Sequence, residues 1–150
     1  MDNHEAQGDA VIAQAQLRRE RLRLTNFTFT RTPNGRCASE VQLEWLDGAR
    51  VTGKSSGLSS PLGDLRVAAE AALDALHNFA GSGLRFELVG VKTLRAFDAN
   101  VVIVSVAHKR PEGAVRLLGS HLSEDDQLRS SAIAVLNATN RILGSHIASR

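Results

Sequence analysis

One pattern occurs twice in this sequence and constrains the fold more than any other feature. Residues 51–81 have the pattern of a strand end, a Gly/Ser-rich segment and a long Ala/Leu helix that ends at glycine. Residues 117–144 repeat that order. Repetition of one supersecondary pattern indicates two units that are each too small to bury their own sheet face and therefore pack against each other. The sequence thus predicts a duplicated fold rather than a series of unrelated elements.

The first unit is predicted to begin with three strands. Apolar and polar residues alternate over 24–32, 41–46 and 49–54, as is typical of half-buried strands. Asp47 and Gly48 lie between the last two strands. This dipeptide is favoured in two-residue type I′ turns, in which both residues have positive φ. We therefore expect a tight type I′ hairpin here.

A helix is predicted to close the first unit, after a loop over residues 55–60. Ser60 is a suitable N-cap, Pro61 suits the first helical position, and Asp64 lies in the first turn, where the helix dipole favours a negative charge. Apolar residues at helical spacing follow, and Gly81 is a typical C-terminal residue. The second unit repeats this design, and residues 123–126 (SEDD) form an acidic capping box ahead of its helix.

The second unit supplies three further strands, over 84–96, 101–106 and 114–119, with a turn at 98–100. The expected fold class is therefore α+β, a two-layer, internally duplicated βββα-βββα domain with antiparallel sheet and the helices on one side. Residues 24–150 would form this single domain, with repeat units 24–83 and 84–144. Residues 1–23 would form an N-terminal extension that is partly helical or disordered and contains a short helix.

Charge and hydropathy restrict the classes of function. The formal net charge is only +2, and strong nonspecific binding of nucleic acid usually needs a larger or clustered surplus. No apolar run approaches the roughly 20 residues that span a bilayer. The N-terminus lacks the pattern of a secretion signal. We therefore expect a cytoplasmic protein that does not bind membranes.

The sequence contains no pattern that points to catalysis, a metal or a cofactor. The five histidines are not spaced as metal ligands, and no serine lies in a G-x-S-x-G elbow. Lys54 precedes the Gly/Ser segment instead of entering a helix, so a Walker phosphate loop is excluded. The only cysteine, Cys37, lacks the neighbours of a nucleophile and is expected to be a bland or mildly exposed thiol. We predict that the protein is not an enzyme.

Two polar segments that contain glycine, 53–64 and 119–126, each lead into a helix N-terminus. Backbone N–H groups at such a position suit a carboxylate or a phosphate, so a small anionic metabolite is a reasonable ligand. Capped helices with nothing bound remain the alternative. The candidate ligand-binding residues, which include one turn residue of the second unit, are Gly53, Ser55, Ser56, Gly57, Pro61, Asp64, Asp98, Gly119, Ser120, His121 and Asp126.

A second hypothesis is binding of RNA or DNA through an N-terminal arginine cluster and an exposed sheet face. The cluster consists of Arg18, Arg19, Arg21, Arg23 and Arg31. Against this stand the near-balanced charge and the shortage of aromatic residues, since the chain has no tyrosine and one tryptophan.

Several segments together resemble the C-terminal regulatory domain of 2-isopropylmalate synthase. They are G-x-S-S-G, P-L-G-D-L, F-D-A-N-V-V-I-V-S-V and, most strongly, the segment from Ser130 to Arg141. The resemblance covers about residues 40–144. It implies βββα units, a homodimer, and binding of leucine or a similar small molecule near the dimer interface to control a distant catalytic barrel.

The chain also departs from this family. His121 and Leu122 replace small residues in the second polar segment, and the first segment is longer than usual. No barrel is expected ahead of residue 40. The resemblance therefore implies a free-standing, non-enzymatic dimerising module, with an altered site for an amino acid or organic acid, and no synthase activity.

Overall fold

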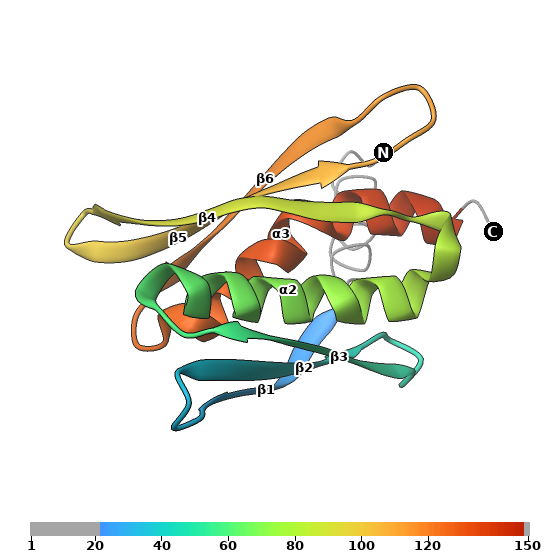
Figure 1. The fold of residues 1–150 in the computed structure, drawn as a ribbon. Helices are drawn as coiled ribbons and strands as arrows, with labels where there is room; N and C mark the ends of the chain where they lie inside the picture. Colours follow the sequence, from blue (N-terminus) through green and yellow to red (C-terminus); the bar gives the residue numbers. More distant parts are fainter. Residues whose placement is uncertain (1–21, 149–150) are drawn as a thin grey trace, which may run out of the picture.

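A computed structural model describes residues 22–148, with side chains up to residue 145, and shows the βββα order twice (Figure 1). The elements of the first unit are β1 (Arg23–Arg31), β2 (Arg36–Glu44), β3 (Arg50–Leu58) and α2 (Pro61–Ala80). A short 3-10 helix, Gly81–Gly83, leads into the second unit, which consists of β4 (Phe86–Ala96), β5 (Ala99–His108), β6 (Val115–Ser123) and α3 (Gln127–Ala148). The predicted duplication is confirmed. The predicted N-terminal helix lies outside the described residues.

The six strands form two separate antiparallel sheets and not the single sheet that was expected. Sheet A has the order β1-β2-β3 and sheet B the order β4-β5-β6. Each sheet packs against the helix of its own unit, and the two helices lie between the sheets (Figure 1). The two-layer arrangement therefore describes each unit, whereas the chain as a whole has helices covered on both sides. The reason is that α2 has buried alanines and leucines around most of its circumference, so elements of both units must pack against it.

The core consists of the inner faces of both middle strands and the two helices. In β5, Val102, Val104 and Val106 are fully buried, and Val41 and Leu43 occupy the same positions in β2. Alternate residues of each strand point away from the helices, so each sheet also has an outer face. Within the described residues, no helix is both long and apolar enough to cross a lipid bilayer.

Each helix lies directly on the backbone of its third strand, at a glycine. A Cβ atom on Gly53 would lie 2.2 Å from the Ala71 carbonyl oxygen, and one on Gly119 would lie 2.1 Å from that of Ala134. Atoms cannot approach so closely, so only glycine allows strand and helix to pack at this separation. The glycines that the sequence suggests for loops therefore serve strand–helix packing.

The Gly/Ser segment of the first unit differs from the prediction because it is not a loop. Residues 55–58 continue β3 and pair with β2, with Ser55 opposite Ser39 and Gly57 opposite Cys37. In the second unit β6 also runs further than predicted, to Ser123. The helix start was predicted well, because α2 begins at Pro61 and the Ser60 hydroxyl accepts a hydrogen bond of 2.8 Å from the Gly63 N–H.

The predicted type I′ turn at Asp47 and Gly48 is wrong. Gly48 has a φ of 87°, but Asp47 does not have positive φ, and the Asp47 carboxylate accepts a hydrogen bond from the Ala49 N–H. This side-chain bond holds a longer loop. The two-residue turn with positive φ lies instead between β4 and β5, at Phe97 (φ 53°) and Asp98 (φ 60°).

Candidate functional site

The predicted ligand-binding residues do not converge on one site. Ser55 and Ser56 line a shallow hollow on sheet A. Pro61 and Asp64 line a cleft between the two units. His121 and Asp126 line a third hollow at the start of α3.

The other predicted residues have structural surroundings. Gly53 and Gly119 lie beneath the helices, as described above. The Ser120 carbonyl accepts a hydrogen bond of 2.8 Å from the Asn137 side-chain amide. Gly57 faces the helix, where an added Cβ would lie 3.3 Å from a Val67 methyl carbon, and Asp98 is exposed in the β4–β5 turn. These positions serve packing and chain reversal.

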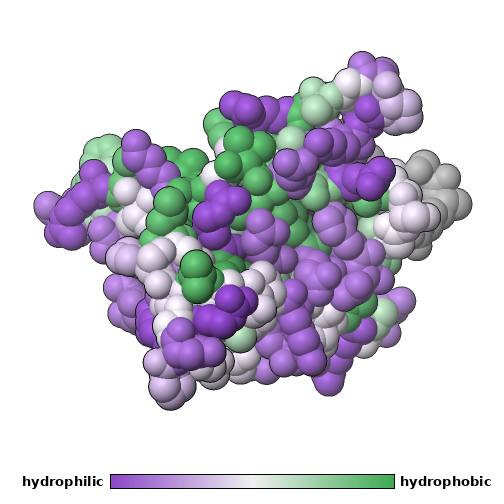
Figure 2. Space-filling view, in the orientation of Figure 1, coloured by the Kyte–Doolittle hydropathy of each residue, from purple (hydrophilic) through white to green (hydrophobic). Residues whose placement is uncertain are grey.

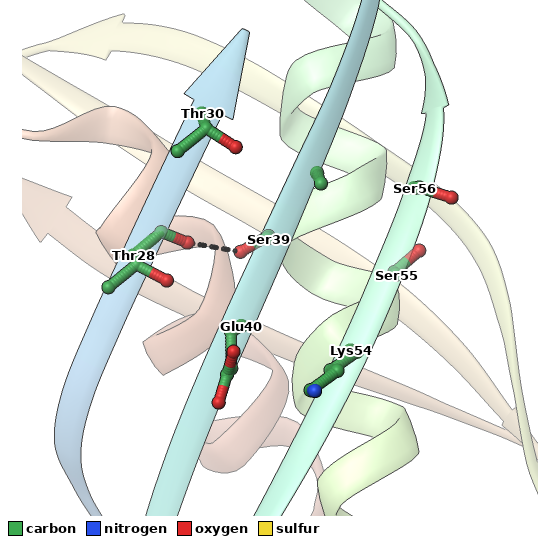
Figure 3. Close-up of a pocket in the computed structure, with 8 residues that line it drawn as sticks. Thr28, Thr30, Ser39, Glu40, Lys54, Ser55 and Ser56 are labelled. Atoms are coloured by element: carbon green, nitrogen blue, oxygen red, sulfur yellow. Dashed lines mark hydrogen bonds between the residues drawn. The ribbon is translucent and has the colours of Figure 1, made fainter. Parts of the chain in front are cut away.

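The hollow on sheet A is polar and open, with a volume of about 500 Å³. Figure 3 shows Glu40 and Lys54 on the neighbouring strands β2 and β3, with Thr28 and Thr30 on β1 and the Ser56 hydroxyl pointing away from them. Its lining contains no aromatic residue, so it offers no platform on which a nucleic-acid base could stack. The arginines at 18, 19 and 21 lie outside the described residues. No observation on sheet A therefore favours nucleic-acid binding.

The cleft between the units has a volume of about 690 Å³ and lies where α2 and α3 begin. The first unit contributes the end of β1 and the first turn of α2, and the second unit contributes β4 and the first residues of α3. Its lining residues are Arg31, Pro61, Leu62, Asp64, Leu65, Val91, Lys92, Thr93, Gln127 and Leu128. The cleft is thus formed by the packing of the duplicated halves.

Asp64 is held by its own chain and is not free to bind a ligand. The carboxylate is 5% exposed. Its Oδ2 atom accepts hydrogen bonds from Arg31 at 2.8 and 3.1 Å, and its Oδ1 atom accepts one from the Ser59 hydroxyl at 2.8 Å. Burial alone would raise the pKa of Asp64, but the hydrogen bonds from Ser59, Arg31 and the Cys37 thiol outweigh it and lower the pKa. Asp64 therefore fastens one wall of the cleft as a carboxylate.

Cys37 belongs to the same network. It is buried, so it is not even a mildly exposed thiol. Burial, together with the neighbouring Asp64 carboxylate, raises its pKa. A protonated, enclosed thiol is a poor nucleophile, so this cysteine contributes packing rather than reactivity.

The backbone N–H groups that were expected to bind an anion are largely occupied. In α2, Ser60 accepts from the N–H groups of Gly63 and Asp64. In α3, the Asp126 carboxylate accepts from the N–H groups of Leu128 and Arg129, at 3.0 and 3.1 Å. The cap of α3 is itself negative, so an anion placed there would face a like charge. The alternative of internally capped helices is therefore the better description of both N-termini.

Binding groups in the cleft come instead from β4. Lys92 is exposed and has no ion-pair partner among the side chains that the structure describes. Next to it in the chain, the Thr93 hydroxyl is buried and makes no hydrogen bond. Leu62, Val91 and Leu128 supply apolar surface nearby. The cleft thus combines a free cation, an unsatisfied hydroxyl and an apolar wall.

The third hollow is acidic. Glu124, Asp125 and Asp126 line it, and His121 lies 3.0 Å from the Ser130 hydroxyl through its Nδ1 atom. Across the described part of the chain, no group of three His, Cys, Asp or Glu side chains is placed to hold a metal ion. The acidic lining makes this hollow a poor place for an anionic ligand.

Sequence reasoning missed the two β4 residues that matter most in the cleft. Lys92 and Thr93 lie inside a predicted strand, where a lysine and a threonine are unremarkable. Arg31 was considered only for nucleic acid. Comparison with known proteins adds no family to this picture, because no family model and no curated protein matches the sequence.

Proposed function

We propose that the protein is a non-enzymatic, dimerising module that binds a small anionic metabolite, an amino acid or organic acid, in the cleft between its two units. In type it would correspond to the regulatory domain that the sequence resembles. The observation that carries this proposal is that one cleft is lined by Lys92, which has no ion-pair partner among the described side chains, and by the unsatisfied Thr93 hydroxyl, beside an apolar wall.

The chemistry of the cleft suits a molecule with a charged end and a short apolar body. A carboxylate would pair with the Lys92 ammonium at the edge of β4, and a second polar group of the ligand would bond the Thr93 hydroxyl, because consecutive side chains of a strand point to opposite faces. Methyl or methylene groups would contact Leu62 and Leu128. A volume of about 690 Å³ is in the range of small-molecule sites, which is about 300–1,000 Å³.

The test is a thermal-shift screen of amino acids and short organic acids. A ligand present at about 100 times its Kd stabilises a protein by about 2.7 kcal/mol, which for a chain of this size raises Tm by roughly 5–10 °C. Lys92→Ala should reduce the shift of the best ligand by at least half. Lys54→Ala removes an exposed cation from the hollow on sheet A and should leave the shift unchanged.

Two results would contradict the ligand half of the proposal. One is a screen in which no compound raises Tm at millimolar concentration. The other is an equal loss of the shift in Lys54→Ala and Lys92→Ala, which would show a general charge effect and not a site in the cleft.

A further inference from the structure

The outer faces of the two sheets differ strongly at matched positions. Val41 pairs with Gly53 in sheet A, and Val104 pairs with Gly119 in sheet B. Aligning these two pairs matches each position of sheet A with one position of sheet B. On sheet A the outer positions around the middle strand are Thr30, Ala38, Glu40, Thr52 and Ser56. The matched positions on sheet B are Leu94, Val101, Ile103, Leu118 and Leu122. The outer face of sheet B is therefore apolar at five positions where that of sheet A is polar or small, while Thr28/Lys92, Gln42/Ser105 and Lys54/Ser120 are polar in both.

We call this surface of sheet B the apolar face; it consists of Val89, Leu94, Val101, Ile103, Leu118 and Leu122. Leu118 is 69% exposed and Leu122 is 52% exposed, and Val89 and Leu94 are also exposed. Figure 2 shows hydrophobic residues gathered over the upper part of the molecule, where sheet B lies, and hydrophilic residues over the part formed by sheet A. Contiguous exposed apolar surface marks an interaction site.

Phe97 extends the apolar face at one end. It lies in the β4–β5 turn, three residues after Leu94, and its side chain is fully exposed. Its φ of 53° is unusual for a bulky residue, because asparagine or glycine normally occupies such a turn. No described residue covers the exposed ring. This exposure is explained if the ring is buried against another molecule.

The charge pattern favours a second copy over other partners. In the three central rows of the outer face, centred on Val101, Ile103 and Ser105, the only charged residue is Lys92, on the edge strand β4. Because this single cation lies on the edge strand, the face can meet its own copy without placing like charges at its centre. A phosphate backbone or an anionic membrane would instead call for a cluster of cations.

The size of the face also fits a dimer. The whole outer face of sheet B, which extends beyond the apolar face to Glu87 and Arg116, covers about 14 by 30 Å, or roughly 400 Å² per copy for three strands of about nine paired residues. Two such faces bury roughly 800–900 Å² plus the two Phe97 rings, which is near the lower limit for a specific interface. A dimer with a dissociation constant in the micromolar range is therefore expected.

We infer that the apolar face, together with Phe97, is the surface on which a second copy of this chain docks sheet to sheet. The two faces would pack about 10 Å apart with interdigitated side chains, as sheets do in a sandwich. This inference rests on the dimerising half of the proposed function and assigns it to one surface. Lys92, which neighbours the apolar face on β4, also lines the cleft, so the test uses variants at other positions.

The test compares matched double variants by sedimentation equilibrium at roughly 5–200 µM protein, a span chosen around the expected micromolar dissociation constant. The unsubstituted protein should be a dimer at the upper end. L94D/L122D places carboxylates on the apolar face and should weaken dimerisation by at least about 100-fold. T30D/S56D makes the same changes at the matched positions of sheet A and should leave the dimer intact.

Phe97→Ser is a second variant that does not remove packing, because the ring is fully exposed in the described part of the chain. It should weaken the dimer by about tenfold. Circular dichroism of each variant shows whether the fold is kept.

Other outcomes have distinct meanings. If the dimer persists in L94D/L122D and Phe97→Ser, the protein dimerises elsewhere and only this inference is overturned. If the unsubstituted protein is a monomer at every concentration, the dimerising half of the proposed function falls as well. A monomer that sediments with phosphatidylcholine or phosphatidylserine vesicles would assign the apolar face to a membrane and would also overturn the inference.

Discussion

The two units of this protein are most alike where the helix meets the third strand. In both, a glycine lies beneath alanines of the helix. In both, the next residue of the strand is held by a helix side chain: Asp74 accepts a hydrogen bond from the Lys54 N–H, and Asn137 donates one to the Ser120 carbonyl. Asp74 and Asn137 occupy the same position in their helices. The duplication has therefore kept this contact even where the residue type changed.

The units differ at the start of the helix and on the outer face of the sheet. Asp64 of the first unit is buried in an ionic network, whereas Gln127 at the matched position is partly exposed and lines the cleft. The outer faces differ as described above. The comparison teaches that folding constrains the contact between the third strand and the helix. The two units differ in the cleft, where we propose a ligand, and on the outer face of the sheet, where we propose the second copy.

The largest effect is expected from alanine at the shared glycines. Gly53→Ala and Gly119→Ala would each place a Cβ within 2.2 Å of helix backbone, so the helix must move away from its sheet. We expect each to lower the free energy of unfolding by about 3 kcal/mol or more, as measured by urea denaturation.

The control for the glycine variants is Gly90→Ala. Gly90 lies in β4 with nothing within 4 Å of an added Cβ and without positive φ, so the change should stay within about 0.5 kcal/mol. If only one of the two variants lowers the free energy of unfolding, the two strand–helix contacts are not equivalent, and the main similarity between the units is contradicted.

A smaller effect is expected from Asp64→Ala. It leaves Ser59 and Arg31 without their acceptor and removes a cross-link between β1 and α2, which should cost about 2 kcal/mol of stability. Gln127→Ala at the matched position should cost less than about 0.5 kcal/mol. Equal losses in denaturation experiments would show that the two helix starts are not energetically different.

The smallest effect concerns pH. His77 accepts a hydrogen bond from the Phe86 N–H through Nε2, and burial, aided by Arg85 and opposed by Asp74, lowers its pKa. The unfolded chain therefore binds a proton at His77 more readily than the folded protein does. The stabilising contribution of neutral His77 is present above the ordinary histidine pKa, and it is lost as the pH falls toward the lowered pKa of the folded state.

We expect the stability of the protein to decline gently from pH 7.5 to 5.5, and His77→Gln to flatten this slope when Tm is followed across the range. The matched residue of the second unit is Asn140, which does not titrate. Asn140→Gln should therefore leave the slope unchanged. An unchanged slope in His77→Gln would assign the pH dependence to another group, such as His108, whose pKa is also lowered by burial.

The sequence predicted the order of elements because that order depends on local patterns. The N-cap Ser60, the N1 residue Pro61 and the Ala/Leu spacing of α2 all act within a few residues. The sequence predicts a loop over residues 55–60 because glycine and serine have low strand propensity. In the structure, small residues there permit a strand to touch a helix that begins only after residue 60.

The cleft could not be predicted for a related reason. It is made by packing of residues that are distant in sequence, such as Arg31, Lys92 and Leu128. Nothing in the local pattern of β4 distinguishes Lys92 from an ordinary solvated lysine. Leu118 lies in a predicted strand that ends at residue 119, and Leu122 lies beyond it. Only the register of sheet B shows that both share a face with Val101 and Ile103.

The burial of α2 between both sheets has a consequence for synthesis of the chain on the ribosome. This helix packs on β2 and β3 of its own unit and also on β4 and α3 of the other. When residue 80 has emerged, only part of its surface can be covered. Translation proceeds at about 5–20 residues per second, so several seconds pass before α3 is complete. During that interval the nascent first unit exposes alanines and leucines of α2, and it is then that a chaperone would find a binding site.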